Sequence, residues 1–121
     1  MGEQIRTKSV YEPSSPDDGL RVLTTQYWPR GVRKERVGKY LRVLGPSRIL
    51  LHGFKEGDIS WNQYRRRYLT EMQRPEAQTA LSQLRELSSA DQAITIMCVC
   101  RSGEHCHRTL IKQLLEDSAA Q

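Results

Sequence analysis

The sequence predicts an α/β fold: a single compact layer domain, with a mainly parallel sheet of about four strands and helices on both faces. Strand-like and helix-like segments alternate along the 121 residues, as in chains built from βαβ units. Residues 93–100 (AITIMCVC) are apolar at almost every position, as in a central strand covered on both sides. The length suits one modest hydrophobic core, so we expect one domain over residues 1–121.

The first half of the chain predicts three strands, a loop and a helix. Residues 5–10 and 20–27 are rich in β-branched and apolar side chains, which favour strands. Residues 11–19 (YEPSSPDDG) separate them and predict a loop, because proline, serine and Asp-Gly favour turns. Residues 32–44 place apolar side chains near helical spacing, so we expect a helix there. Residues 48–54 (RILLHGF) predict a short buried strand.

The second half predicts three helices around the strand at 93–100. Ser60 is a candidate N-cap with Gln63 three residues later, the pattern of a capping box. Pro75 opens the next helix, at a position where proline is tolerated. Residues 105–116 (HCHRTLIKQLLE) predict the last helix, and we expect residues 118–121 to form a frayed tail.

Composition and charge restrict the expected partners and location. The chain has 19 Lys and Arg against 14 Asp and Glu, a net charge of +5, which favours anionic partners. Solubility alone explains a charge of this size, so we expect nucleic-acid binding to be weak and non-specific at most. No apolar run approaches the roughly 20 residues of a membrane span, and residues 1–10 lack the apolar core of a signal peptide. We therefore expect a cytoplasmic protein without a membrane partner, and its oligomeric state stays open.

Three cysteines and two histidines lie between Cys98 and His107. The odd number of cysteines, in a compartment that keeps thiols reduced, predicts no disulfide framework. Cys98 and Cys100 lie two residues apart on a predicted strand and therefore point to the same side, where Cys98 suits apolar packing. Structural zinc sites use ligands in two well-separated pairs, unlike this spacing, so we expect no metal and no cofactor.

Cys106 lies at the start of the last predicted helix, where backbone N–H groups lack helical partners and the helix dipole is positive. With His107 and Arg108 beside it, we expect its pKa to be lowered and its thiol to be the most reactive of the three. An oxyanion could bind at the same position. In an enzyme, Cys106 would be the nucleophile and His107 the proton donor or acceptor. The alternative is that Cys106 and His107 only pack and cap the helix.

A second group of candidate site residues follows the predicted strand at 20–27. Ligands of parallel sheets bind outside the carboxyl ends of the strands, where Tyr27, Trp28 and Arg30 lie. We expect these three residues and Arg108 to form an anion-binding pocket together with the cysteines. The alternative is a plain turn in which Trp28 covers the core and Arg30 faces solvent.

These motifs together resemble the family called domain of unknown function 488, including its YeaO-like branch. The stretches that carry the resemblance are VYEPSSPDDGLRVLTTQYWPRG (10–31), WNQYRRRYLTEM (61–72) and IMCVCRSGEHCHRTLI (96–111). The resemblance covers residues 5–115 and implies a compact α/β domain of bacterial or archaeal type. It implies no activity, because the family name assigns none. The chain has Thr25 and Gln26 where that branch usually has Asp-Arg, and Cys100 where a Glu is expected. Chemistry that depends on those side chains in relatives would be lost or changed here.

Two classes of function remain open, and the sequence does not decide whether the chain is an enzyme. The first is a small enzyme or ligand-binding domain that takes a small anionic ligand in a cysteine-containing pocket at the carboxyl ends of the strands. The second is a non-catalytic nucleic-acid-binding or regulatory module, whose phosphate contacts would come from Arg65, Arg66, Arg67 and Arg74. Basic residues from distant segments meeting in a concave site would favour the first class, and a flat basic helix face would favour the second.

Overall fold

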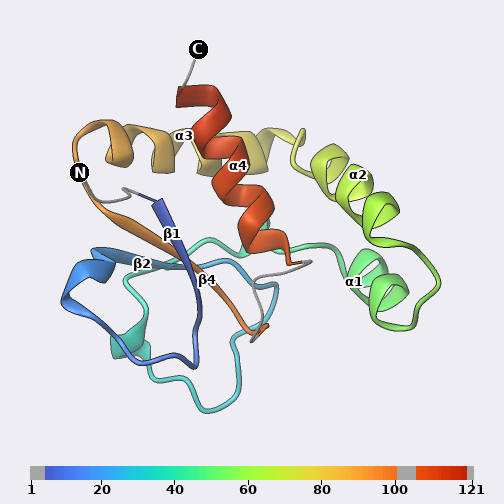
Figure 1. Cartoon of the computed structure of the whole chain (residues 1–121), viewed down its shortest axis with the longest axis horizontal. Coiled ribbons are helices and arrows are strands. Elements are labelled where there is room, and N and C mark those ends of the chain that lie inside the picture. The colour runs from blue at the N-terminus through green and yellow to red at the C-terminus, as the bar shows by residue number, and fades with distance from the viewer. Residues whose placement is uncertain (1–4, 101–105, 120–121) are drawn as a thin grey trace.

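A computed structural model describes residues 5–100 and 106–119 of the chain (Figure 1). Within these residues it contains four α-helices, a four-stranded sheet and three short 3-10 turns. The helices are α1 (Arg48–Lys55), α2 (Trp61–Glu71), α3 (Pro75–Ser89) and α4 (His107–Ala119). The strands are β1 (Ile5–Ser9), β2 (Leu20–Leu23), β3 (Lys39–Tyr40) and β4 (Ile94–Cys98). The 3-10 turns are η1 (Pro16–Asp18), η2 (Lys34–Arg36) and η3 (Arg42–Leu44).

The sheet is parallel throughout its described strands, in the order β1-β4-β2-β3. Ile94 at the start of β4 is in register with Ile5 of β1 on one side and with Leu20 of β2 on the other. Every residue of β4 is buried, as predicted for a central strand covered on both sides. The α/β fold class is therefore confirmed. The parallel directions place the ends of β2 and β4 at the same edge of the sheet.

The two faces of the sheet are covered differently. On one face, Ile94 and Ile96 belong to a core cluster that includes residues of all four described α-helices, such as Leu110 and Ile111. Figure 1 shows α3 and α4 together above the strands. The cluster on the opposite face contains no residue of α1–α4 among the described residues. Its members and the residues packed against it are Val10, Leu23, Val32, Val37, Tyr40 and Met97. The expectation of helices on both faces is thus corrected: the α-helices gather on one face, and loops and a 3-10 turn cover the other.

The predicted helix at 32–44 is wrong. This segment instead forms η2, the short strand β3 and η3. Gly38 explains part of the difference, because its backbone N–H donates to Arg21 O at 2.8 Å, and a Cβ on it would lie 2.8 Å from Leu20 Cδ1. Only a residue without a side chain allows the chain to approach β2 so closely.

The predicted strand at 48–54 is also wrong, because these residues form α1. Ser47 caps the helix by accepting a hydrogen bond from Leu50 N at 3.2 Å. The backbone N–H of Ser47 donates to Glu71 Oε1 at 2.9 Å, and its hydroxyl contacts the other oxygen of that carboxylate. A cap held by a partner at the end of α2 outweighs the local strand preference.

The helices predicted in the second half are confirmed. Ser60 and Gln63 form both hydrogen bonds of the capping box at the start of α2, and Pro75 is the first residue of α3. Tyr64 and Tyr68 of α2 are buried as expected. The last helix runs to Ala119, so the tail expected at 118–121 begins inside α4, and residues 120–121 lie outside the described part of the chain.

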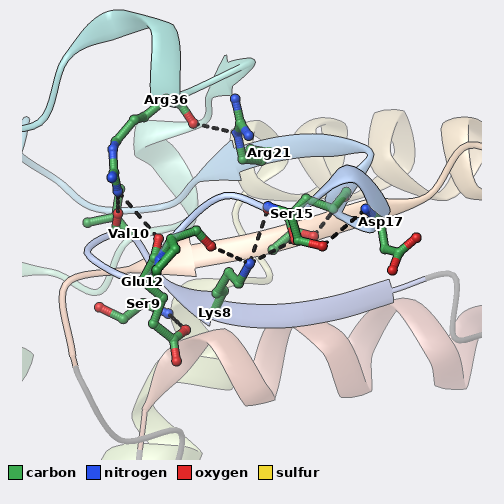
Figure 2. A network of polar contacts seen from close by, with 11 residues as sticks. Lys8, Ser9, Val10, Glu12, Ser15, Asp17, Arg21 and Arg36 are labelled. Atoms are coloured by element: carbon green, nitrogen blue, oxygen red, sulfur yellow. Dashed lines mark hydrogen bonds and ion pairs between the residues drawn. The ribbon is translucent and has the colours of Figure 1, made fainter.

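The loop predicted at 11–19 contains η1 and is ordered by a buried carboxylate, Asp18. Figure 2 shows Lys8 and Ser15 of this polar network. Lys8 Nζ donates to Asp18 Oδ1 at 2.9 Å, and Ser15 N donates to Asp18 Oδ2 at 2.9 Å. Burial alone would raise the pKa of Asp18, but the hydrogen bonds from Ser15 and Lys8 lower it below its usual value. The same figure shows Arg36 reaching Val10 O, which ties the loop to η2.

None of the helices that the structure describes combines the length and the apolar character that crossing a membrane requires.

Candidate functional site

A pocket of about 340 Å³ opens at the sheet edge where β2 and β4 end. The segment after β2 forms one wall, with Tyr27 and Trp28 at 58% and 40% exposed. Helix α1 forms a second wall and α2 contributes Tyr64. The lining residues are Thr25, Gln26, Tyr27, Trp28, Pro29, Pro46, Arg48, Leu51, Phe54, Lys55, Tyr64, Val99, Cys100, Cys106 and His107. The site therefore lies where ligands bind in open parallel sheets.

The three cysteine sulfur atoms converge beside this pocket. Their Sγ atoms all lie within 4.8 Å of one another, and Cys98 Sγ is 2.9 Å from Cys106 Sγ. All three are free thiols. The last residue of β4 is Cys98, Cys100 follows two residues later, and Cys106 comes from the start of α4. The sheet edge thus brings Cys98 and Cys106, which are eight residues apart in the sequence, into contact.

The three thiols differ in exposure and acidity. Cys98 is fully buried, as the sequence predicts, whereas Cys100 is partly exposed and lines the pocket. Hydrogen bonds from the thiols of Cys106 and Cys98, assisted by His107 and Arg108, lower the pKa of Cys100. The hydrogen bond to Cys100 and burial raise the pKa of Cys106 to about 11.

The expected acidity of Cys106 is therefore corrected. Its side chain is only 2% exposed, and its thiol is used as a donor. Burial of the thiolate and the hydrogen bond to Cys100 raise the pKa of Cys106 more than the start of α4 lowers it. The pKa of Cys100, and not that of Cys106, is the one that its surroundings lower.

Arg108 is a buried cation without a carboxylate partner among the residues that the structure describes. It is 4% exposed, and its Nη1 donates to Cys100 O at 2.9 Å and contacts Cys98 Sγ at 3.5 Å. Its Nε has no hydrogen-bond partner. The one ion pair within residues 5–100 and 106–119 joins Lys8 and Asp18, far from this site in the sequence. A thiolate among the neighbouring sulfurs would compensate the charge of this buried guanidinium.

His107 is held in one tautomer by the backbone at the end of β2. Its Nε2 lies 2.8 Å from Thr24 O, which can only accept, so Nε2 carries the hydrogen and Nδ1 has a free lone pair. Nδ1 lies 3.8 Å from Cys106 Sγ. Burial lowers the pKa of His107 to about 4, so the ring is neutral near pH 7. The Nδ1 lone pair of His107 can therefore accept a hydrogen bond from the Cys106 thiol.

Only some of the residues expected to bind an anion line the pocket. Tyr27 and Trp28 line the mouth of the pocket, but Arg30 is exposed and is not part of the lining. Arg108 lies beside the sulfurs and is likewise absent from the lining. Their place at the wall is taken by Arg48 and Lys55 of α1, with Arg48 Cζ 5.8 Å from the centre of the Tyr27 ring.

The sequence reasoning missed several residues of the site. Arg48, Lys55 and Phe54 were missed because residues 48–54 were expected to form a strand, although Ser47 before them is a helix-capping residue. Tyr64 was not predicted as a site residue, yet its ring centroid lies 4.8 Å from that of Phe54 and it borders the pocket.

The three sulfurs also form a possible set of metal ligands, and their geometry tests that possibility. Two thiolates on one tetrahedral zinc ion with Zn–S bonds of about 2.3 Å lie roughly 3.8 Å apart. The 2.9 Å between Cys98 and Cys106 is shorter, and the Arg108 guanidinium already occupies space 3.5 Å from Cys98 Sγ. The separation of Cys98 and Cys106 therefore differs from that of two zinc ligands.

Comparison with known proteins gives a consistent set of relatives. The family model described as "Active DUF488-N3 subclade" matches residues 5–119. The uncharacterized proteins Rv3073c of Mycobacterium tuberculosis and Mb3100c of Mycobacterium bovis are each 32% identical over 114 residues, 93% of this chain and 93% of theirs. The uncharacterized protein YeaO of Escherichia coli is 31% identical over 70 residues, 56% of this chain and 61% of its own. No solved structure matches the chain.

Proposed function

The chain belongs to the family of domain of unknown function 488, in the subclade described as active, and from this premise we propose that it is a small enzyme whose nucleophile is a cysteine thiolate. The observation that carries the proposal is the buried Arg108 beside three converging sulfurs, of which Cys100 lines a pocket and is partly exposed. Catalytic cysteines occupy such electropositive, partly accessible surroundings, whereas structural cysteines are buried in apolar ones.

Each side chain of the cluster has a distinct role in this proposal. Cys100 attacks, because it alone of the three is partly exposed and its thiolate accepts hydrogen bonds from the other two thiols. Cys106, expected from the sequence to be the nucleophile, becomes the proton donor. His107, expected to donate or accept a proton, instead contacts Cys106 through Nδ1 and takes no proton in this scheme. Arg108 stabilises the negative charge and does not touch the substrate.

The reaction class is nucleophilic displacement through a covalent intermediate. Cys100 Sγ bonds to an electrophilic atom of the substrate, the bond to the leaving group breaks, and the leaving group takes the proton of Cys106. Water then attacks the intermediate and breaks the bond to sulfur. Its proton returns to Cys106, so that the Cys100 thiolate and the Cys106 thiol are both restored.

The walls of the pocket indicate the chemistry of the substrate. Aromatic rings of Tyr27, Trp28 and Tyr64 border a volume of about 340 Å³, which suits a small molecule with a flat apolar body. Arg48 and Lys55 stand on α1 at the same wall and favour one anionic group. We therefore expect a small anionic substrate, bound through α1 rather than through Arg30.

The test is to alkylate the reduced protein with iodoacetamide and with iodoacetate, and to locate the label by mass spectrometry. We expect Cys100 to be labelled first, about 30 times faster than a free thiol near pH 7, where only a few per cent of a free thiol is ionised. Iodoacetate, the anionic reagent, should label Cys100 faster still. Arg48→Ala should remove this additional rate without slowing the reaction with iodoacetamide. Labelling of Cys106 ahead of Cys100, or rates no faster than those of a free thiol, would refute the proposal.

The alternative, a nucleic-acid-binding module, depends on the exposed residues Arg65, Arg66, Arg67 and Arg74. The first three are consecutive in α2, and consecutive residues of a helix point about 100° apart. They therefore do not form one flat basic face. This arrangement supports the enzyme over the binding module.

A further inference from the structure

The cysteine cluster combines one sulfur that solvent reaches with neighbours that solvent does not reach. Cys100 is partly exposed, and the Sγ atoms of Cys98 and Cys106 lie within 4.8 Å of its own. We propose that Cys100 is a site of reversible oxidation by hydroperoxides, and that Cys106 resolves the oxidised form into a Cys100–Cys106 disulfide. The inference rests on the proposed function only in taking Cys100 as the accessible thiolate.

The positions of the sulfurs carry this assignment. Cys100 and Cys106 both line the pocket, which has room for a small hydroperoxide, whereas Cys98 does not line it. Oxidation-sensing cysteines are accessible, have thiolate character and lie next to a second cysteine that can close a disulfide. The described residues bring these three conditions together at the pocket.

The oxidation requires only the groups of the cluster and one hydroperoxide molecule. The Cys100 thiolate attacks the outer oxygen of the hydroperoxide, the O–O bond breaks, and Cys100 becomes a sulfenic acid. The departing alkoxide takes the proton of Cys106 and leaves as an alcohol. The Cys106 thiolate then attacks the Cys100 sulfur and expels hydroxide, which takes a proton from solvent to form water.

Arg108 supports the second step. Its backbone N–H hydrogen-bonds to the Cys106 sulfur, which favours the Cys106 thiolate before it attacks. His107 Nδ1 lies 3.8 Å from the same sulfur. A small dithiol reverses the change by thiol–disulfide exchange, in which its two sulfurs are oxidised and both cysteines are reduced. Closing the disulfide removes the Cys100 thiolate, so oxidation would switch the proposed enzyme off reversibly.

The experiment treats the reduced full chain with one equivalent of hydrogen peroxide, blocks the remaining thiols and maps the peptides by mass spectrometry. We expect a Cys100–Cys106 link that dithiothreitol reverses and that still forms in Cys98→Ser, which shows that Cys98 is not the resolving cysteine. In Cys106→Ser the link should be absent, and dimedone should trap the sulfenic acid on Cys100. In Cys100→Ser the consumption of peroxide should fall about 30-fold, as expected when a free thiol replaces a thiolate.

The outcomes separate this inference from the proposed function. If Cys100 alkylates rapidly but peroxide yields no disulfide, or a Cys98–Cys106 link, or an irreversible sulfinic acid at Cys100, the resolving role of Cys106 is wrong and the proposed nucleophile stands. If Cys100 reacts with neither reagent faster than a free thiol, both fail. Circular dichroism of each variant shows whether a lost reaction reflects a lost fold, and dimedone trapping in the unmodified chain tests the sulfenic acid without any substitution.

Discussion

Arg108 enters the site from the first turn of α4, and its guanidinium contacts the backbone of Cys100 and the sulfur of Cys98. Its charge has no carboxylate partner among the described residues, and in the proposed function the Cys100 thiolate is its counter-charge. We predict that Arg108→Gln raises the pKa of the Cys100 thiol by about one to two units, each unit corresponding to about 1.4 kcal/mol. The measurement is the absorbance of the thiolate near 240 nm as a function of pH.

Arg108→Lys is the matched variant, because it keeps a positive charge but loses the flat guanidinium. It should retain more of the thiolate than Arg108→Gln does. Cys100→Ser should abolish the absorbance change altogether. Equal titration curves for the Gln variant and the unmodified chain would show that Arg108 does not stabilise the thiolate.

Because the pKa of His107 is lowered, we predict that the free energy of unfolding falls in mild acid. Burial lowers its pKa from 6.5 to about 4, so the unfolded chain binds a proton at a pH where the folded chain does not. The stabilisation is complete above pH 6.5 and is lost as the pH falls towards 4. At pH 5 the free energy of unfolding should be lower by about 2 kcal/mol than at pH 7.5. Urea denaturation at the two pH values measures this difference.

The control for this prediction is His107→Gln, whose side-chain N–H can still donate to Thr24 O but does not titrate. We expect most of the difference between pH 7.5 and pH 5 to disappear in this variant. Asp18 loses its contribution only at lower pH, because its pKa is lowered below the usual value, so it does not obscure the comparison. An undiminished difference in the Gln variant would assign the acid sensitivity to other groups.

At the residue scale, the sequence indicated where the chemistry lies but not which atom carries the charge. The cluster of cysteines at the start of α4 and the aromatic pair Tyr27 and Trp28 are predicted from their places after two strands. The exchange of roles between Cys106 and Cys100 depends on burial and on hydrogen bonds between sulfurs, which no local pattern contains. Thr24, which fixes the tautomer of His107, gave no signal in the sequence because its backbone makes the contact.

At the scale of elements, Gly19 joins η1 to β2 where the backbone of Ala93 approaches most closely. Its φ is 63°, and a Cβ on it would lie 2.2 Å from Ala93 O, the atom that accepts the hydrogen bond of Leu20 N. We predict that Gly19→Ala lowers the free energy of unfolding by about 3 kcal/mol or more, as steric conflict and backbone strain do together. Thermal or urea unfolding measures the change.

Gly31 offers a matched control for Gly19. Its φ of 75° is also positive, but a Cβ on it would meet nothing within 4 Å. Gly31→Ala should therefore lower the free energy of unfolding by about 1 kcal/mol, through backbone strain alone. The difference between the two variants isolates the contact with Ala93. Equal losses would mean that β2 can shift away from β4 at little cost.

Most elements follow from local patterns, and the exceptions have identifiable causes. The capping box at Ser60, the proline at the start of α3 and the apolar run of β4 are local signals, and all three predictions are confirmed. Residues 32–44 are instead held by distant groups, such as the hydrogen bond from Arg21 Nε to Arg36 O at 2.7 Å. In α1 the spacing of Leu50 and Phe54 was available as a helical signal, but the short length of the segment favoured a strand.

At the scale of the whole molecule, the net charge of +5 allows a weak attraction to nucleic acid. We predict that fluorescence anisotropy detects binding of a short labelled duplex at roughly 50 mM salt and none at roughly 200 mM. Replacing Arg65, Arg66 and Arg67 together by Ser should weaken this binding, while leaving the alkylation rate of Cys100 unchanged. Sequence-dependent binding that persists at the higher salt would favour the nucleic-acid-binding module instead.

The position of β4 in the sheet has a consequence for how the protein is made. β4 is the last strand in the sequence, yet it lies between β1 and β2 and pairs with both. A chain leaving the ribosome can pair β2 with β3 over two residue pairs, but its main ladders must wait until β4 has emerged. The three thiols emerge with that strand or just after it. A nascent chain stalled or degraded before this point therefore exposes unpaired strands but carries none of the three thiols.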